Sequence, residues 1–225
     1  GLRRSNLDGS QLQTLPVGSS STRDIALDST AGVLFRVESD GLYRSNLDGS
    51  NSVKIVSLTD YWAVAVDSPR GKVYVGGGKL IRRYNYDGTN GEAFQTDGYD
   101  GARYLALAVN TSDGRVFWSR YTAAPSGDTT CRFYNTIVWK NYDGSGGSFY
   151  SDNSAGPYNP GCNVMYEALA YEPTSNSVFF PSYKENADLS HTTTLKRIPA
   201  NGTGWWAWDI GSIFSGTRGL GFATY

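Results

Sequence analysis

Histidine, methionine and cysteine are scarce in this chain of 225 residues, which holds one His, one Met and two Cys. Zinc sites are built mostly from clusters of His and Cys, and a Ser-His-Asp triad needs a histidine with a matching nucleophile. The single His191 lies in a polar segment, and nothing in the sequence nominates a serine as its nucleophile. We therefore expect no metal and no cofactor, and the composition does not favour an enzyme.

Runs of basic residues and long apolar stretches are also missing. The 20 Lys and Arg residues oppose 21 Asp and Glu residues, which gives a net charge of −1. Nucleic acids and anionic membranes attract strongly basic surfaces, so neither is an expected partner. The longest apolar stretches, such as residues 104–109, are far shorter than the roughly 20 apolar residues that a membrane-spanning helix needs. We expect no membrane span.

Two short phrases recur along the chain. Residues 1–10 read GLRRSNLDGS and residues 41–50 read GLYRSNLDGS, so nine of ten positions agree. The core of this phrase, Asn-x-Asp-Gly-Ser/Thr, starts at positions 6, 46, 85 and 141, with a weaker form at 199. A second, apolar phrase of the form ALAVD starts at 24, 63, 106 and 168, with a last copy at 220. Each phrase therefore occurs five times.

The segments around these phrases predict short strands. One unit contains four β-rich runs, over residues 24–28, 33–38, 41–46 and 53–56. Asp-Gly between two such runs is a strong hairpin signal, because the turn requires positive φ. No segment shows sustained helical periodicity. Four strands in a unit of about 40 residues are typical of a β-propeller blade.

We predict a single all-β domain over residues 1–225, a five-bladed β-propeller of four-stranded antiparallel blades. In the first strand of a unit, small residues alternate with large ones, as Ala63 and Ala65 do with Val64 and Val66. Such strands suit the crowded centre of a propeller. The chain opens with the third and fourth strands of a blade and ends with a first strand, so the N- and C-terminal strands are expected to close the ring. The alternative is an ordinary β-sandwich.

The phrases DIALD…GVLFRV…GLYRSNLDGS and AVAVDSPRGKVYVG resemble the YWTD β-propellers of the low-density lipoprotein receptor family, most closely over residues 1–89. The resemblance implies a propeller fold and binding of extracellular proteins. This chain departs from the family in two ways. That family has six blades where five units are counted here. The aspartate of YWTD is missing from the segments that start at positions 34, 73, 116 and 178.

Three long insertions interrupt the repeats, at residues 120–135, 151–166 and 182–194. All three are expected on the face opposite the Asp-Gly turns, and long loops on a rigid scaffold often carry function. Cys131 and Cys162 lie in two neighbouring insertions and are predicted to form a disulfide, with two free thiols in a cytosolic protein as the alternative. Sequons at Asn110 and Asn201 predict N-glycosylation on the Asp-Gly face.

Aromatic and charged residues gather where the first strands begin, on the face that carries the insertions. Alignment on the apolar phrase places seven candidate ligand-binding residues around the central channel: Arg23, Tyr61, Trp62, Tyr104, Tyr166, Glu167 and Arg218. Aromatic rings with a few charges suit a carbohydrate or small-molecule pocket. The alternative is that these side chains plug the channel.

These features predict a secreted, extracellular glycoprotein that binds a carbohydrate or a protein ligand, as a lectin or an adhesion protein does. A propeller enzyme is one alternative, with carboxylates from Asp24, Asp60, Asp100 and Glu167, although no spacing selects a catalytic pair. A structural extracellular protein without a discrete site is the other. The aspartates of the Asn-x-Asp-Gly phrase are interpreted as turn formers rather than as metal ligands.

Overall fold

The computed structural model describes residues 1–19, 21–98, 102–123, 133–150, 164–166, 168–185, 191–201 and 208–212. In these residues the chain is all-β, apart from one turn of 3-10 helix at Ser68–Arg70. The same residues include no helix with the length and apolar character required to cross a bilayer. The strands form a two-stranded hairpin and four larger antiparallel sheets, which confirms the predicted all-β class.

The four larger sheets, named blades 1 to 4, follow one another along the chain. Blade 1 contains β3 (Asp24–Asp28), β4 (Val33–Glu38), β5 (Gly41–Asn46) and β6 (Val53–Ser57). Blade 2 contains β7 (Ala63–Asp67), β8 (Lys72–Gly77), β9 (Leu80–Asn85) and β10 (Glu92–Thr96). Blade 3 contains β11 (Arg103–Asn110), β12 (Arg115–Ala123), β13 (Phe133–Lys140) and β14 (Ser148–Tyr150). Blade 4 contains β15 (Val164–Met165), β16 (Ala170–Glu172), β17 (Ser177–Glu185), β18 (His191–Pro199) and β19 (Trp208–Ser212).

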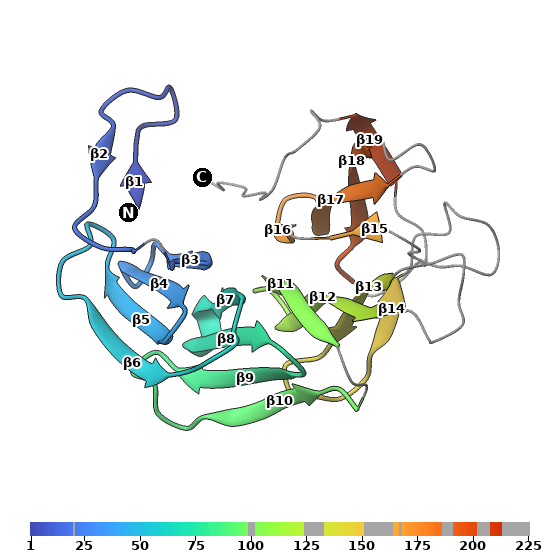
Figure 1. The fold of residues 1–225 in the computed structure, drawn as a ribbon, viewed down its shortest axis with the longest axis horizontal. Coiled ribbons are helices and arrows are strands. Elements are labelled where there is room, and N and C mark those ends of the chain that lie inside the picture. The colour runs from blue at the N-terminus through green and yellow to red at the C-terminus, as the bar shows by residue number, and fades with distance from the viewer. Residues whose placement is uncertain are drawn as a thin grey trace.

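The blades stand around a common centre, with β3, β7, β11 and β16 innermost (Figure 1). Neighbouring inner strands contact one another, β3 with β7, β7 with β11, and β11 with β16. In blades 1 to 3 the chain then runs outward, strand by strand, to β6, β10 and β14. This radial repetition of antiparallel sheets is the architecture of a β-propeller.

The apolar core lies between successive blades. In β7, Ala63 and Ala65 pack in the cluster shared with blade 3, whereas Val64 packs in the cluster shared with blade 1. In β11, Ala106 faces blade 4 and Leu107 faces blade 2. The predicted alternation of small and large residues therefore sorts side chains between two interfaces. Small residues face the next blade, and large ones face the previous blade.

The Asn-x-Asp-Gly-Ser phrase closes the hairpin between the third and fourth strands. In blade 1 the Asn46 and Gly49 N–H groups donate to the Ser50 and Asn46 carbonyls, both at 2.9 Å. The Asp48 carboxylate accepts from the Ser50 N–H at 2.8 Å, and Gly49 has φ of +83°. The turns at positions 6, 85 and 141 repeat this pattern. The phrase recurs because each residue in it satisfies one requirement of the turn.

The hairpin of β1 (Arg3–Arg4) and β2 (Gln13–Thr14) lies against blade 1 in the way that blade 1 lies against blade 2. The surroundings of two equivalent glycines show this. A Cβ atom on Gly49 would lie 2.9 Å from Pro16, which follows β2. A Cβ atom on Gly88 would lie 2.4 Å from the Ile55 carbonyl in β6. The hairpin thus occupies the place of the outer strands of a blade that precedes blade 1. Residues 213–225 lie outside the described residues, so five blades and ring closure stay predictions.

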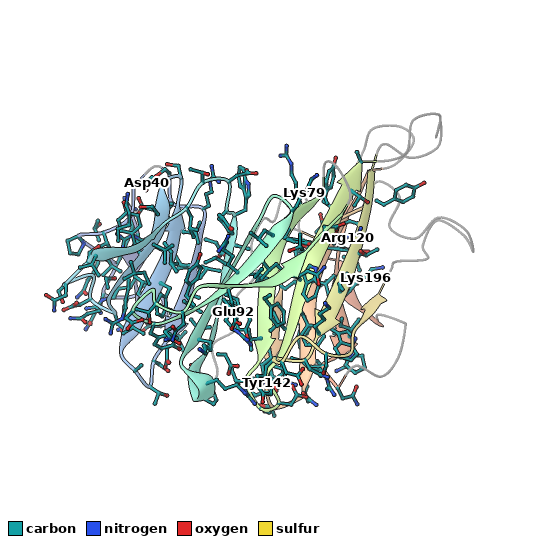
Figure 2. All side chains as sticks on the ribbon, turned by 90° about the horizontal axis from the view of Figure 1, so that it is seen from below. Asp40, Lys79, Glu92, Arg120, Tyr142 and Lys196 are labelled. Atoms are coloured by element: carbon teal, nitrogen blue, oxygen red, sulfur yellow. The ribbon has the colours of Figure 1, made fainter. Side chains whose placement is uncertain are left out.

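The propeller has two rims, which Figure 2 shows from the side. Asp40 and Lys79 mark one rim, named the loop rim, where the second and third strands of each blade connect. Tyr142 marks the opposite rim, named the turn rim, which carries the Asn-x-Asp-Gly turns (Figure 2). The inner strands β3 and β7 begin at the loop rim, because their first residues pair with residues near the ends of the second strands.

Candidate functional site

The three tyrosines predicted to line the site are buried between blades. Tyr61 is 8% exposed and packs between blades 1 and 2, while Tyr104 and Tyr166 have no exposed surface and pack in the next two interfaces. Burial raises the pKa of the Tyr61 hydroxyl, and that of Tyr104 to about 12. This burial does not fit an open floor made of tyrosines. The rings instead fill the interfaces between neighbouring blades.

Arg23, Asp60 and Trp62 form a contact group on the loop rim. Trp62 is 37% exposed, and the Arg23 guanidinium carbon lies 3.9 Å from the centroid of its ring. The indole Nε1–H donates to the Asp60 carboxylate at 3.1 Å, and Arg23 Nη1 donates to the Tyr61 carbonyl at 2.8 Å. The indole is therefore held in one orientation by a cation on its face and an acceptor at its edge. We name these three residues the Trp62 platform.

Glycines of the VGGGKL segment position this platform. A Cβ atom on Gly77 would lie 2.1 Å from the Asp60 carbonyl and 2.3 Å from the Tyr61 Cα. Asp60 itself adopts a positive φ of 62°, and the Trp62 N–H donates to the Gly76 carbonyl at 2.8 Å. The segment before β7 can lie against the end of β8 only because side chains are missing there. Sequence analysis did not connect these glycines to Trp62, although three in succession signal a close backbone approach.

The carboxylate of Asp24 accepts hydrogen bonds from two backbone N–H groups. Its Oδ2 accepts from the Val64 N–H at 2.8 Å and its Oδ1 from the Ile25 N–H at 2.8 Å. Asp24 thereby joins the inner strands of blades 1 and 2. Burial raises the pKa of this carboxyl to about 6, against the two hydrogen bonds, which lower it. The other predicted carboxylates, Asp100 and Glu167, lie outside the described residues.

The aspartates of the turn rim act as turn formers. Hydrogen bonds from the hydroxyl and backbone N–H of Ser50 hold the pKa of the Asp48 carboxyl below its ordinary value. The corresponding turns lower the pKa of Asp8, Asp87 and Asp143 in the same way. In the part of the chain that the structure describes, no three His, Cys, Asp or Glu side chains converge to hold a metal.

The predicted glycosylation sites differ in their surroundings. Asn110 is 1% exposed, and its Nδ2 donates to Asn176 Oδ1 at 3.2 Å and to the Ala200 carbonyl at 3.4 Å. This burial disagrees with the prediction of a glycan on Asn110, because a glycan needs a surface amide. Asn201 is exposed, and its glycosylation stays a prediction.

Four other predicted residues fall outside the described residues. They are the Cys131–Cys162 pair, whose disulfide stays a prediction, and the charged residues Glu167 and Arg218. Of the seven candidates for ligand binding, the structure therefore brings together Arg23 and Trp62 at the loop rim and places three tyrosines in the core. It adds Asp60, which sequence analysis considered only as a catalytic carboxylate.

Comparison with known proteins supports the fold. No protein-family model matches this sequence, and no curated protein is significantly similar to it. Among solved structures, the nidogen propeller in the nidogen/laminin complex superposes with a TM-score of 0.68 at 15% identity, covering 97% of this chain and 75% of that one. A gluconolactonase from Xanthomonas campestris superposes with a TM-score of 0.60 at 15% identity, covering 90% of this chain and 66% of that one.

A third solved structure is also similar in fold. The extracellular domain of a putative one-component system from B. thetaiotaomicron superposes with a TM-score of 0.54 at 10% identity, and this chain spans only 33% of it. All three identities are low, so these likenesses concern the fold alone. The radial sheets and the matches together define the chain as a β-propeller protein. Such folds serve both binding proteins and enzymes.

Proposed function

We propose that this protein is a secreted binding module that holds a carbohydrate or an extracellular protein at the Trp62 platform on its loop rim. The observation that carries the proposal is the exposed, doubly anchored indole of Trp62. An aromatic ring that is already fixed loses little conformational entropy when a ligand packs on it. The Arg23 guanidinium and the Asp60 carboxylate add a donor and an acceptor for polar groups of the ligand.

The surroundings of the platform support this role. Sequence analysis puts the three long insertions on the same face, and Glu167 and Arg218 at neighbouring positions around the channel. We include both residues in the proposed site. The proposed Cys131–Cys162 disulfide is consistent with secretion, and the similar one-component-system structure is that of an extracellular domain.

An unbiased glycan array, followed by titration of the best ligand, tests the proposal. Trp62→Ala should weaken binding by about 1–3 kcal/mol, the range for loss of a buried anchor, without unfolding the propeller. Tyr142→Ala is the matched control, because Tyr142 is also exposed (46%) beneath an arginine but lies on the turn rim. If the control loses binding while Trp62→Ala keeps it, the proposed face is wrong.

A propeller enzyme is the second candidate. The Asp24 carboxyl, with its pKa raised to about 6, is the specific observation in its favour, because perturbed groups gather at active sites. Its two oxygens are occupied by backbone N–H groups, however, which favours the structural role. Turnover of a substrate by the purified protein, abolished by Asp60→Asn or Glu167→Gln, would replace the binding proposal with the enzyme.

A further inference from the structure

A cavity of about 510 Å³ lies between blades 2 and 3, away from the Trp62 platform. Its walls come from the outermost strand of blade 2, β10, and from β11, β12 and β13 of blade 3 (Figure 1). Gly146 and Gly147 line it near the turn rim, where they contribute no side chains. The volume falls in the range of small-molecule sites, roughly 300–1,000 Å³.

The repeat shows that this cavity lies where the equivalent part of the interface between blades 1 and 2 is apolar, beside the apolar cluster that blades 2 and 3 share. The strand registers align equivalent strands of successive blades. Each residue in the interface between blades 1 and 2 therefore has an equivalent position in the interface between blades 2 and 3. In the first interface Leu58 and Tyr84 belong to the apolar core. In the interface between blades 2 and 3, polar residues occupy the equivalent positions. The replacements are Val56 by Gln95, Leu58 by Asp97, Gly77 by Arg120, Leu80 by Thr136 and Tyr84 by Lys140. Departures from a repeat that remove core packing are expected at functional sites.

The charges in the cavity do not balance. Asp97 is 7% exposed and forms an ion pair with Arg120 through two hydrogen bonds, one of them 3.1 Å long between Arg120 Nη2 and Asp97 Oδ1. The charge of Arg120, which Figure 2 labels between the two rims, is therefore compensated. Lys140 also lines the cavity, and no hydrogen bond or ion pair joins its ammonium group to another described residue. Within the part of the chain that the structure describes, the cavity thus holds one lysine charge without a counter-charge.

We propose that this cavity binds a small organic carboxylate with hydroxyl groups, of the size of a sugar acid. One carboxylate matches the charge of Lys140, which has no counter-charge among the described residues. Gln95 and Thr136 offer donors and acceptors for hydroxyl groups, and Trp118 supplies an apolar wall. A doubly charged phosphate would need the charge of Arg120 as well, and Asp97 already occupies that group. This site is separate from the Trp62 platform and does not depend on the function proposed for it.

Isothermal titration calorimetry with glucuronate, glucose and inorganic phosphate tests the proposal. We expect glucuronate to bind at least tenfold more tightly than glucose or phosphate, and more weakly as the salt concentration rises. Lys140→Met should weaken glucuronate binding at least tenfold. Lys54→Met is the matched control, because Lys54 is an exposed lysine of blade 1 paired with Asp40, and it should change nothing.

Asp97→Asn is expected to change glucuronate affinity in the opposite direction from Lys140→Met. It releases Arg120 from its counter-charge, so glucuronate should bind more tightly to this variant than to the parent protein. The proposal is overturned if glucuronate binds more weakly than about 10 mM, if glucose or phosphate binds as well as glucuronate, or if Lys140→Met binds like the parent. Melting temperatures confirm that each variant is folded.

Discussion

The carboxyl of Asp24, which accepts hydrogen bonds between the inner strands of blades 1 and 2, is expected to make the stability of the protein depend on pH. Its pKa in the folded protein is about 6, above the ordinary value of 3.8 for an aspartate, so the folded state holds this proton more tightly than the unfolded state. The stabilising contribution is therefore complete below about pH 4 and is lost as the pH rises towards 6. Asp24→Asn keeps an oxygen for the Val64 N–H without the charge. The unfolding free energy of Asp24→Asn, relative to that of the parent protein, should rise by roughly 2–3 kcal/mol between pH 4 and 7.

Urea denaturation at several pH values measures this difference. Asp8→Asn is the control, because the pKa of this exposed turn carboxyl is lowered, so its contribution has the opposite sign and is lost as the pH falls. Parallel stability curves for the parent and Asp24→Asn between pH 4 and 7 would contradict the role assigned to Asp24.

At the scale of the element, the connection from β6 to β7 depends on the absence of a side chain at Gly77. An added methyl group would collide with the backbone of Asp60 and Tyr61 at 2.1–2.3 Å, and neither can rotate away. Gly77→Ala should therefore displace the Trp62 platform and cost about 1–3 kcal/mol in unfolding free energy. Gly98→Ala is the control, because a Cβ atom there meets nothing within 4 Å. Tryptophan fluorescence and chemical denaturation report the two effects, and equal behaviour of both variants would refute this explanation.

The strands and turns could be predicted from sequence, whereas much of the candidate site could not. The Asn46–Ser50 turn is specified by its own five residues, so its signal is local and repeats wherever the phrase repeats. Of the two partners of Trp62, Asp60 is only two residues away in the sequence, whereas Arg23 reaches the indole only through the packing of blade 1 on blade 2. The burial of Tyr104 likewise depends on a neighbouring blade. The cavity did leave a signal, since Asp97 stands where the repeat has Leu58, but that comparison needs the strand registers.

At the scale of the whole molecule, β3 presents an apolar face towards the place of a preceding blade. Ile25 and Leu27 are 44% and 57% exposed, and they occupy the positions that in β7 and β11 hold large residues packed against the previous blade. The hairpin β1–β2 supplies only the outer part of such a blade. We propose that the C-terminal segment, with its last copy of the apolar phrase at residue 220, supplies the inner strand, covers both side chains and closes a ring of five blades.

Serine substitutions decide whether this closure exists. If the C-terminal strand covers the face, Ile25→Ser and Leu27→Ser should each cost roughly 1.5–3 kcal/mol in unfolding free energy, the value of a buried aliphatic side chain. Deletion of residues 218–225 should cost at least as much and abolish the effect of both substitutions, because it removes the surface that they contact. Val53→Ser, at a 51% exposed position of the outer strand β6, should stay within about 0.5 kcal/mol of the parent. If Ile25→Ser and Leu27→Ser behave like this control in urea denaturation, the face is solvent-exposed and the ring is not closed by the end of the chain.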